Sequence, residues 1–227
     1  MKLKGICKKL ICGFLAVVVM CACVACNFGG NEPGREDGQN VPMKYLVQDG
    51  RCDYSVVIAE NASETEEFAA EELVSFMNEV TGVKLPVKRD SEVVYGTSTK
   101  IISIGKNDLS KKAGLTNINA REVNTDGFVF KNVGEMIFIN SYCDRGTLNG
   151  VYDFIERYLG VKFLTFDTTY IPKTKDVQIE QTLNVLEKPA FEIRHVYSQA
   201  VSDQLFAARR RLIGGGGETM SKYGGGI

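Results

Sequence analysis

The stretch from Ser63 to Gly82, SETEEFAAEELVSFMNEVTG, decides the fold because it predicts one long amphipathic helix. Ser63 and Glu66 have the spacing of a capping box, in which the hydroxyl accepts from an unpaired amide and the glutamate reaches back to the cap residue. Gly82 follows as the expected left-handed cap. Five apolar residues between them recur at steps of three and four and predict a face that packs: Ala69, Leu73, Phe76, Met77 and Val80.

The same stretch is rich in glutamate, with Glu64, Glu66, Glu67, Glu71 and Glu72. These residues could be metal ligands, or they could form a solvated helix face whose first-turn carboxylates meet the favourable end of the helix dipole. We prefer the solvated face, because charge runs on helices are usually in water. We therefore predict no metal site and no cofactor.

Short apolar runs on both sides of this helix predict β-strands. Two precede it, at Tyr45–Val47 and Tyr54–Ile58. Ile101–Gly105 follows it, and after a polar stretch comes a hairpin-like pair at Phe128–Phe130 and Met136–Ile139.

A second helix is expected to start near Asp144 and to end at Gly160. Its apolar face consists of Leu148, Val151, Tyr152, Ile155 and Leu159. Two further strands are expected at Val161–Leu164 and Val177–Ile179. Two helices interleaved with at least six strands predict an α+β fold for residues 41–186, a mixed β-sheet with the two main helices packed on one face.

Composition excludes several classes of protein. The chain has 27 Lys and Arg against 28 Asp and Glu. The first 26 residues hold four lysines and no acidic residue, which leaves 23 basic against 28 acidic groups. A nucleic-acid partner is not expected, because binding phosphates needs a basic face. The chain has one histidine, His195, too few for a His-rich zinc site.

The amino terminus has the pattern of an export signal. Four lysines lie within the first nine residues, and an uncharged apolar run follows at Leu10–Ala25. The cysteines at its end resemble a bacterial lipobox, and we favour Cys26 over Cys23 as the lipidated residue, because polar, glycine-rich sequence follows it directly. An uncleaved anchor and a cleaved soluble signal are the alternatives. Residues 1–26 are thus predicted to be a lipoprotein signal peptide and 27–40 a flexible tether, in an exported protein held at the membrane by its lipid.

Outside this segment the chain has two cysteines, Cys52 and Cys143. They could form a disulfide in an exported protein or pack as free thiols. Each lies beside an apolar strand pattern, and two cysteines define no disulfide framework, so we expect free thiols.

Four segments carry a resemblance to a known family: Glu66–Leu73, Val80–Pro86, Asp144–Glu156 and Tyr158–Leu164. They resemble the first helix, the following strand, the second helix and the next strand of the amino-terminal domain of bacterial alpha-glucuronidases. The related non-catalytic second domain of beta-hexosaminidases is similar too. The resemblance covers nearly all of residues 43–200, in the same order along the chain.

The resemblance places the start of a (β/α)8 catalytic barrel after Pro189. We expect a first barrel strand within Glu187–Tyr197, a helix at Phe206–Ile213 and a glycine-rich loop from Gly214 to Gly226. Residues 187–227 would then be the start of a truncated barrel, which needs eight strands. The resemblance puts the catalytic carboxylates on later barrel strands, so we assign no catalytic residue here. We also expect no acid-lined cleft between the segment after Pro189 and the preceding domain.

One site residue carries over from the resemblance. Arg194 matches an arginine that, in hexosaminidase-like families, contacts hydroxyls of the terminal sugar at the end of the first barrel strand. A guanidinium can bind two hydroxyls or a uronate carboxylate through paired hydrogen bonds. A structural salt bridge is the alternative, and His195 stands where hexosaminidases commonly have glycine. We expect His195 to be a packed or surface imidazole.

Three functions remain. The first is the amino-terminal accessory portion of an exported, lipid-anchored glycoside hydrolase for polysaccharide breakdown, which would meet carbohydrate through its barrel. The second is a non-catalytic surface lipoprotein that binds carbohydrate or a partner. A solute-binding lipoprotein of a transporter fits less well, because such proteins usually have two doubly wound lobes.

Overall fold

The long helix forms as the sequence predicts. In the computed structural model, which describes residues 41–191, 193–212 and 221–224, α2 runs from Glu64 to Thr81. The Ser63 hydroxyl accepts from the Glu66 amide at 3.2 Å, and the Glu66 carboxylate accepts from the Ser63 amide at 3.1 Å, which completes the capping box. Gly82 ends the helix with φ 78°, a left-handed conformation that favours glycine.

A six-stranded mixed sheet forms the centre of the domain, as predicted. Its strand order is β10-β5-β6-β4-β2-β3. β2, β3, β4 and β6 are parallel, whereas β5 and β10 pair antiparallel at one edge. The strands are β2 Ser55–Ile58, β3 Val87–Arg89, β4 Ile101–Ile104, β5 Phe128–Val133, β6 Met136–Ser141 and β10 Asn184–Glu187.

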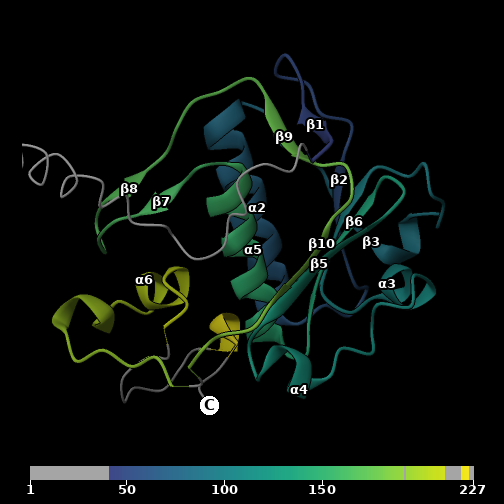
Figure 1. The fold of residues 1–227 in the computed structure, drawn as a ribbon. Coiled ribbons are helices and arrows are strands. Elements are labelled where there is room, and N and C mark those ends of the chain that lie inside the picture. Colours follow the sequence, from purple (N-terminus) through teal and green to yellow (C-terminus); the bar gives the residue numbers. More distant parts are fainter. Residues whose placement is uncertain (1–40, 192, 213–220, 225–227) are drawn as a thin grey trace, which may run out of the picture. The chain divides into compact units, whose positions relative to one another are not determined.

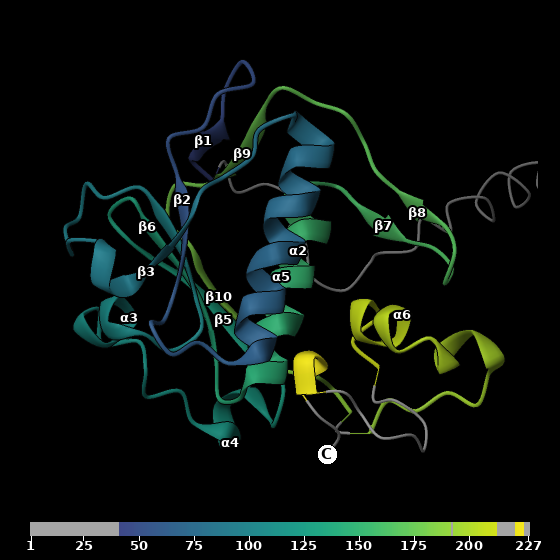
Figure 2. The same ribbon diagram turned by 180° about the vertical axis from the view of Figure 1, so that it is seen from behind.

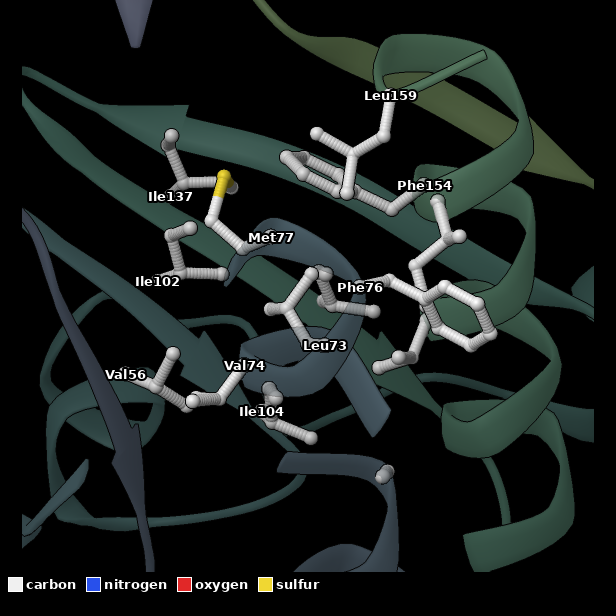
Figure 3. Packing of buried hydrophobic residues seen from close by; sticks show 14 of the residues in the cluster. Val56, Leu73, Val74, Phe76, Met77, Ile102, Ile104, Ile137, Phe154 and Leu159 are labelled. Atoms are coloured by element: carbon white, nitrogen blue, oxygen red, sulfur yellow. The ribbon is translucent and has the colours of Figure 1, made fainter. Parts of the chain in front are cut away.

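The two main helices cover one face of this sheet, which confirms that part of the prediction. α5 spans Asp144–Tyr158 and lies beside α2 in both views (Figure 1, Figure 2). Leu73 and Met77 of α2 meet Ile102 and Ile137 of the sheet in a fully buried cluster (Figure 3). α5 approaches the sheet at Gly150, where a Cβ atom would lie 2.9 Å from Ile139 Cγ2.

The opposite face of the sheet is covered by short helices in the polar stretch that the sequence analysis left without structure. These are α3 Asp108–Lys112 and α4 Ala120–Val123, with a 3-10 turn η1 at Asp90–Glu92. Asn107 caps α3 by accepting from two amides, and its Nδ2 donates to Ser103 at 2.7 Å. A second, smaller apolar cluster forms here from Val57, Ile101, Leu109, Met136 and Phe138.

Two pairs of strands lie outside the central sheet. β1 Met43–Val47 pairs antiparallel with β9 Val177–Glu180, and β7 Lys162–Phe163 pairs with β8 Thr169–Tyr170. The sequence analysis missed β3, β8 and β10. β10 is partly exposed on both faces, so it lacks the continuous apolar run that marks the buried strands β2, β4 and β6.

The two cysteines of the folded domain, Cys52 and Cys143, are free thiols, as predicted. Burial raises the pKa of both thiols. The predicted signal peptide, Cys26 and the tether lie outside the described residues. No helix in the described part of the chain is long and apolar enough to span a membrane.

Candidate functional site: an arginine-rich segment docked on the helices

The segment after Pro189 differs from the barrel strand expected there. Residues 191 and 193–198 form neither helix nor strand, and Glu187 belongs to β10 of the central sheet. The chain then forms a 3-10 turn η2 at Gln199–Ser202 and a short helix α6 at Gln204–Arg209 (Figure 1). The helix expected at Phe206–Ile213 therefore starts earlier and ends earlier, because Asp203 caps its amino end and Arg211 has φ 56°.

α6 is joined to α2 by a partly buried ion pair between Arg209 and Glu72. The guanidinium donates from Nε and Nη2 to both carboxylate oxygens, at 3.0 and 3.1 Å. Tyr152 of α5 donates its hydroxyl to the same carboxylate at 2.9 Å, and burial with this neighbouring charge raises the pKa of Tyr152. Arg209 also lies over the rings of Phe76 and Phe163, at 5.2 and 5.3 Å from their centroids. Such two-pronged pairing fixes both position and orientation of α6.

A second buried pair holds Arg194. Its guanidinium donates to the carboxylate of Asp126, to the Arg211 carbonyl and to the Phe191 carbonyl. The Asp126 side chain is only 2% exposed and also lies 3.7 Å from Nε of Arg145. Burial lowers the pKa of Arg145, and Asp126 opposes that shift. Arg194 therefore forms a salt bridge in this structure, which is the role that the sequence analysis gave as the alternative to a sugar contact.

A third set of pairs connects the end of the segment to α5. Arg211 donates to Glu156 at 2.7 Å and lies 3.6 Å from Asp153, while Arg210 lies 3.9 Å from Glu156. Burial raises the pKa of Asp153, opposed by Arg157 and Arg211. Four arginines of one segment are thus paired with acids of the α+β domain: Arg194, Arg209, Arg210 and Arg211.

The docked segment closes a pocket of about 300 Å³ against the domain, which the sequence analysis did not expect. Three acids line it, Asp126, Asp153 and Glu187, but Arg194, Arg210 and Arg211 line it too. Each acid is paired with an arginine, Glu187 with Arg157 at 2.9 Å. The expectation that no acid-lined cleft would form between this segment and the domain was therefore wrong. Two of the three acids, Asp126 and Asp153, take part in the ion pairs that hold the segment.

The interpretation of the acidic cluster on α2 as a solvated face was wrong for Glu66 and Glu72. Both are buried, one in the capping box and the other in the pair with Arg209. Glu72 lies three residues after Ala69 and four before Phe76, so it stands on the apolar stripe, and this spacing was a usable signal. Among the described residues no group of three or more His, Cys, Asp or Glu side chains could hold a metal ion.

Two further features that the sequence analysis discussed are His195 and the glycine-rich stretch from Gly214 to Gly226. The His195 ring stacks edge-on against Tyr197, with 4.5 Å between centroids. Most of the glycine-rich stretch lies outside the described residues. Within it, a 3-10 turn η3 at Ser221–Tyr223 packs on α2, where the ring centroids of Tyr223 and Phe68 lie 5.4 Å apart.

Comparison with known proteins places the α+β domain in a class associated with glycoside hydrolases. The family described as Glycosyl hydrolase family 67 N-terminus matches residues 40–154, just over half of the chain. The chain belongs to this family of amino-terminal domains, which confirms the resemblance found in the sequence. No curated protein matches the sequence.

Solved structures that match part of this chain include glycoside hydrolases. One is a family GH115 4-O-methyl-alpha-glucuronidase with specificity for decorated arabinogalactans, at 17% identity and a TM-score of 0.50. The match covers 70% of this chain and 24% of that enzyme, so the chain spans about a quarter of its length. A Streptomyces plicatus beta-hexosaminidase bound to its product GlcNAc matches at 10% identity over 76% of this chain and 30% of that one, with a TM-score of 0.43.

Proposed function

We propose that this chain is the amino-terminal accessory portion of an exported, lipid-anchored glycoside hydrolase involved in polysaccharide breakdown. The observation that carries the proposal is the family match over residues 40–154. Carbohydrate would meet the protein through a catalytic domain that follows the α+β domain. That domain would be a (β/α)8 barrel, of which the segment after Pro189 is the first part.

In this proposal the α+β domain acts as a brace, by which we mean that it fixes the position of the domain that follows it. The four paired arginines between Arg194 and Arg211 hold the segment after Pro189 against α2, α5 and the loop that contains Asp126. A segment held at several buried points has few orientations, so the domain that follows it is held in place as well. The sugar contact of Arg194 stays a prediction, and it requires the guanidinium to leave Asp126.

Residues 41–227 are expected to hydrolyse no glycoside, because the proposal puts the pair of catalytic acids in the following domain. The measurement is release of nitrophenol from a panel of aryl glycosides and aryl glucuronides. Turnover above the uncatalysed rate would place working acids in this part of the chain. A longer chain that includes the following domain serves as the positive control.

The lipid anchor is proposed from the sequence alone. Cells fed radiolabelled palmitate are expected to label the wild type and to lose the label in the Cys26→Ser variant, because the thiol of Cys26 carries the lipid in this proposal. Cys12→Ser is the matched control, since it changes a cysteine of the same apolar segment away from the lipobox. Label that persists in Cys26→Ser and disappears only when Cys23 is changed would move the anchor to Cys23.

A further inference from the structure

The first strand of the domain, β1, places apolar side chains in solvent and a lysine against the domain. Met43 and Tyr45 are 48% and 46% exposed, and Val41 just before the strand is 45% exposed. Residues two apart in an extended chain point to the same side, so these three side chains form one row. Lys44 points to the other side, where it donates to Glu135 at 2.9 Å and its side chain is only 16% exposed. We call the row of Val41, Met43 and Tyr45 the β1 apolar face.

A bulge confines the β1 apolar face to the amino-terminal half of the strand. The register of the pairing with β9 shifts between Tyr45 and Val47, and Val47 is fully buried. With regular alternation Val47 would continue the exposed row, so the bulge is what turns it into the core. The strand thus buries its last apolar residues and leaves its first ones outside. Contiguous apolar side chains on a surface mark a site of interaction.

The surroundings of the β1 apolar face carry little excess charge. On β9, Gln178 stands opposite Tyr45 and Glu180 stands opposite Met43. Oε2 of Glu180 is buried, so this carboxylate turns away from solvent. The exposed charges in the two loops at the end of the β1–β9 pair nearly balance, with Arg51, Lys173 and Lys175 against Asp49 and Asp176. A partner for this face therefore needs apolar surface and no particular charge.

The position of the face in the chain selects a lipid bilayer as that partner. The cysteine proposed to carry the lipid, Cys26, precedes Val41 by 15 residues. A flexible tether of this length spans about 20 Å on average. A domain of this size is roughly 40 Å across, so the surface around Val41 meets the bilayer more often than any distant surface does. Such a short link raises the effective concentration of the bilayer at this face, so even a weak contact is populated.

We propose that the β1 apolar face lies in the headgroup region of the bilayer that holds the lipid anchor. The proposal rests on the anchor of the proposed function. Tyrosine favours this region, because its ring is apolar and its hydroxyl remains hydrated. Buried apolar area supplies the contact and charge does not, so the contact forms on zwitterionic lipids and persists in high salt.

Fluorescence of the lipidated full chain in phosphatidylcholine vesicles tests the proposal. The chain has no tryptophan, so Tyr45→Trp introduces a single reporter on the β1 apolar face. In vesicles whose acyl chains carry bromine near the headgroups, this variant is expected to lose most of its emission, because bromine quenches tryptophan at close range. Tyr170→Trp is the matched control, since Tyr170 is 56% exposed on β8, which lies apart from β1 in both views (Figure 1, Figure 2). Its emission should stay unquenched.

A second change tests whether the apolar row makes the contact. Met43→Glu, added to Tyr45→Trp, places a charge at an exposed position of the same row and should abolish the quenching while the protein still floats with the vesicles. Flotation without quenching of Tyr45→Trp, equal quenching of Tyr45→Trp and Tyr170→Trp, or quenching that survives Met43→Glu would refute the contact and leave the anchor intact. A wild-type chain that does not float with the vesicles would refute the anchor, and this proposal with it.

Discussion

Asp126→Ala is expected to lower the free energy of unfolding of the α+β domain by about 3–5 kcal/mol, the cost of removing one partner of a buried ion pair. The Asp126 carboxylate faces Arg145 and Arg194, whose side chains are 8% and 19% exposed, and accepts from Asn149 Nδ2 at 3.1 Å. Without it, the guanidinium groups of Arg145 and Arg194 lose the carboxylate that both of them face. Urea unfolding monitored by circular dichroism measures the change.

The control for this prediction is Asp53→Ala. Asp53 pairs with Lys100 at 2.8 Å, but its side chain is 77% exposed. Exposed pairs contribute about 0–1 kcal/mol, so this variant should unfold close to the wild type. Asp126→Asn keeps the size of the side chain and removes the negative charge. It therefore measures the contribution of the charge to stability separately from that of packing. Similar small effects for Asp126→Ala and Asp53→Ala would show that the Asp126 cluster contributes little to stability.

Elements with strong local patterns were predictable from the sequence, and weakly patterned ones were not. The capping box and the apolar repeat of α2 lie within one continuous stretch, so local rules were sufficient for that helix. The β5–β6 hairpin was found for the same reason, since short apolar runs mark its strands and its turn contains Gly134. α3 and α4 are only one turn long, and their side-chain caps, Asn107 and Asn119, are local signals that the sequence analysis did not use.

The interface could not be predicted because its partners are far apart in the chain. Glu72 and Arg209 are separated by 137 residues, and Asp126 and Arg194 by 68. No periodicity connects residues at such separations, and the arginines at 209–211 fitted a barrel helix equally well. For Arg194, a structural salt bridge was the predicted alternative to a sugar contact, but its partner Asp126 was not identified. Pairing of this kind is specified by tertiary packing alone.

Glu72→Gln is expected to raise the rate at which trypsin cuts after Arg209, Arg210 or Arg211 by at least tenfold, which corresponds to about 1.4 kcal/mol of lost stability in the docked segment. The variant keeps an oxygen that accepts from Tyr152 and removes the charge that pairs with Arg209. Cleavage requires the segment to leave α2, and its rate follows the population of the open form when opening is fast. Mass spectrometry of the early fragments identifies the bonds cut.

Glu67→Gln provides the matched control for this experiment, because it makes the same substitution on the same helix. Glu67 pairs with Arg89 at 2.9 Å, its side chain is 49% exposed, and neither residue belongs to the docked segment. Cleavage after Arg209–Arg211 should therefore stay at the wild-type rate. If both variants were cut at the same rate, the Glu72–Arg209 pair would not hold α6, and the brace would have to act through Asp126 and Glu156 instead.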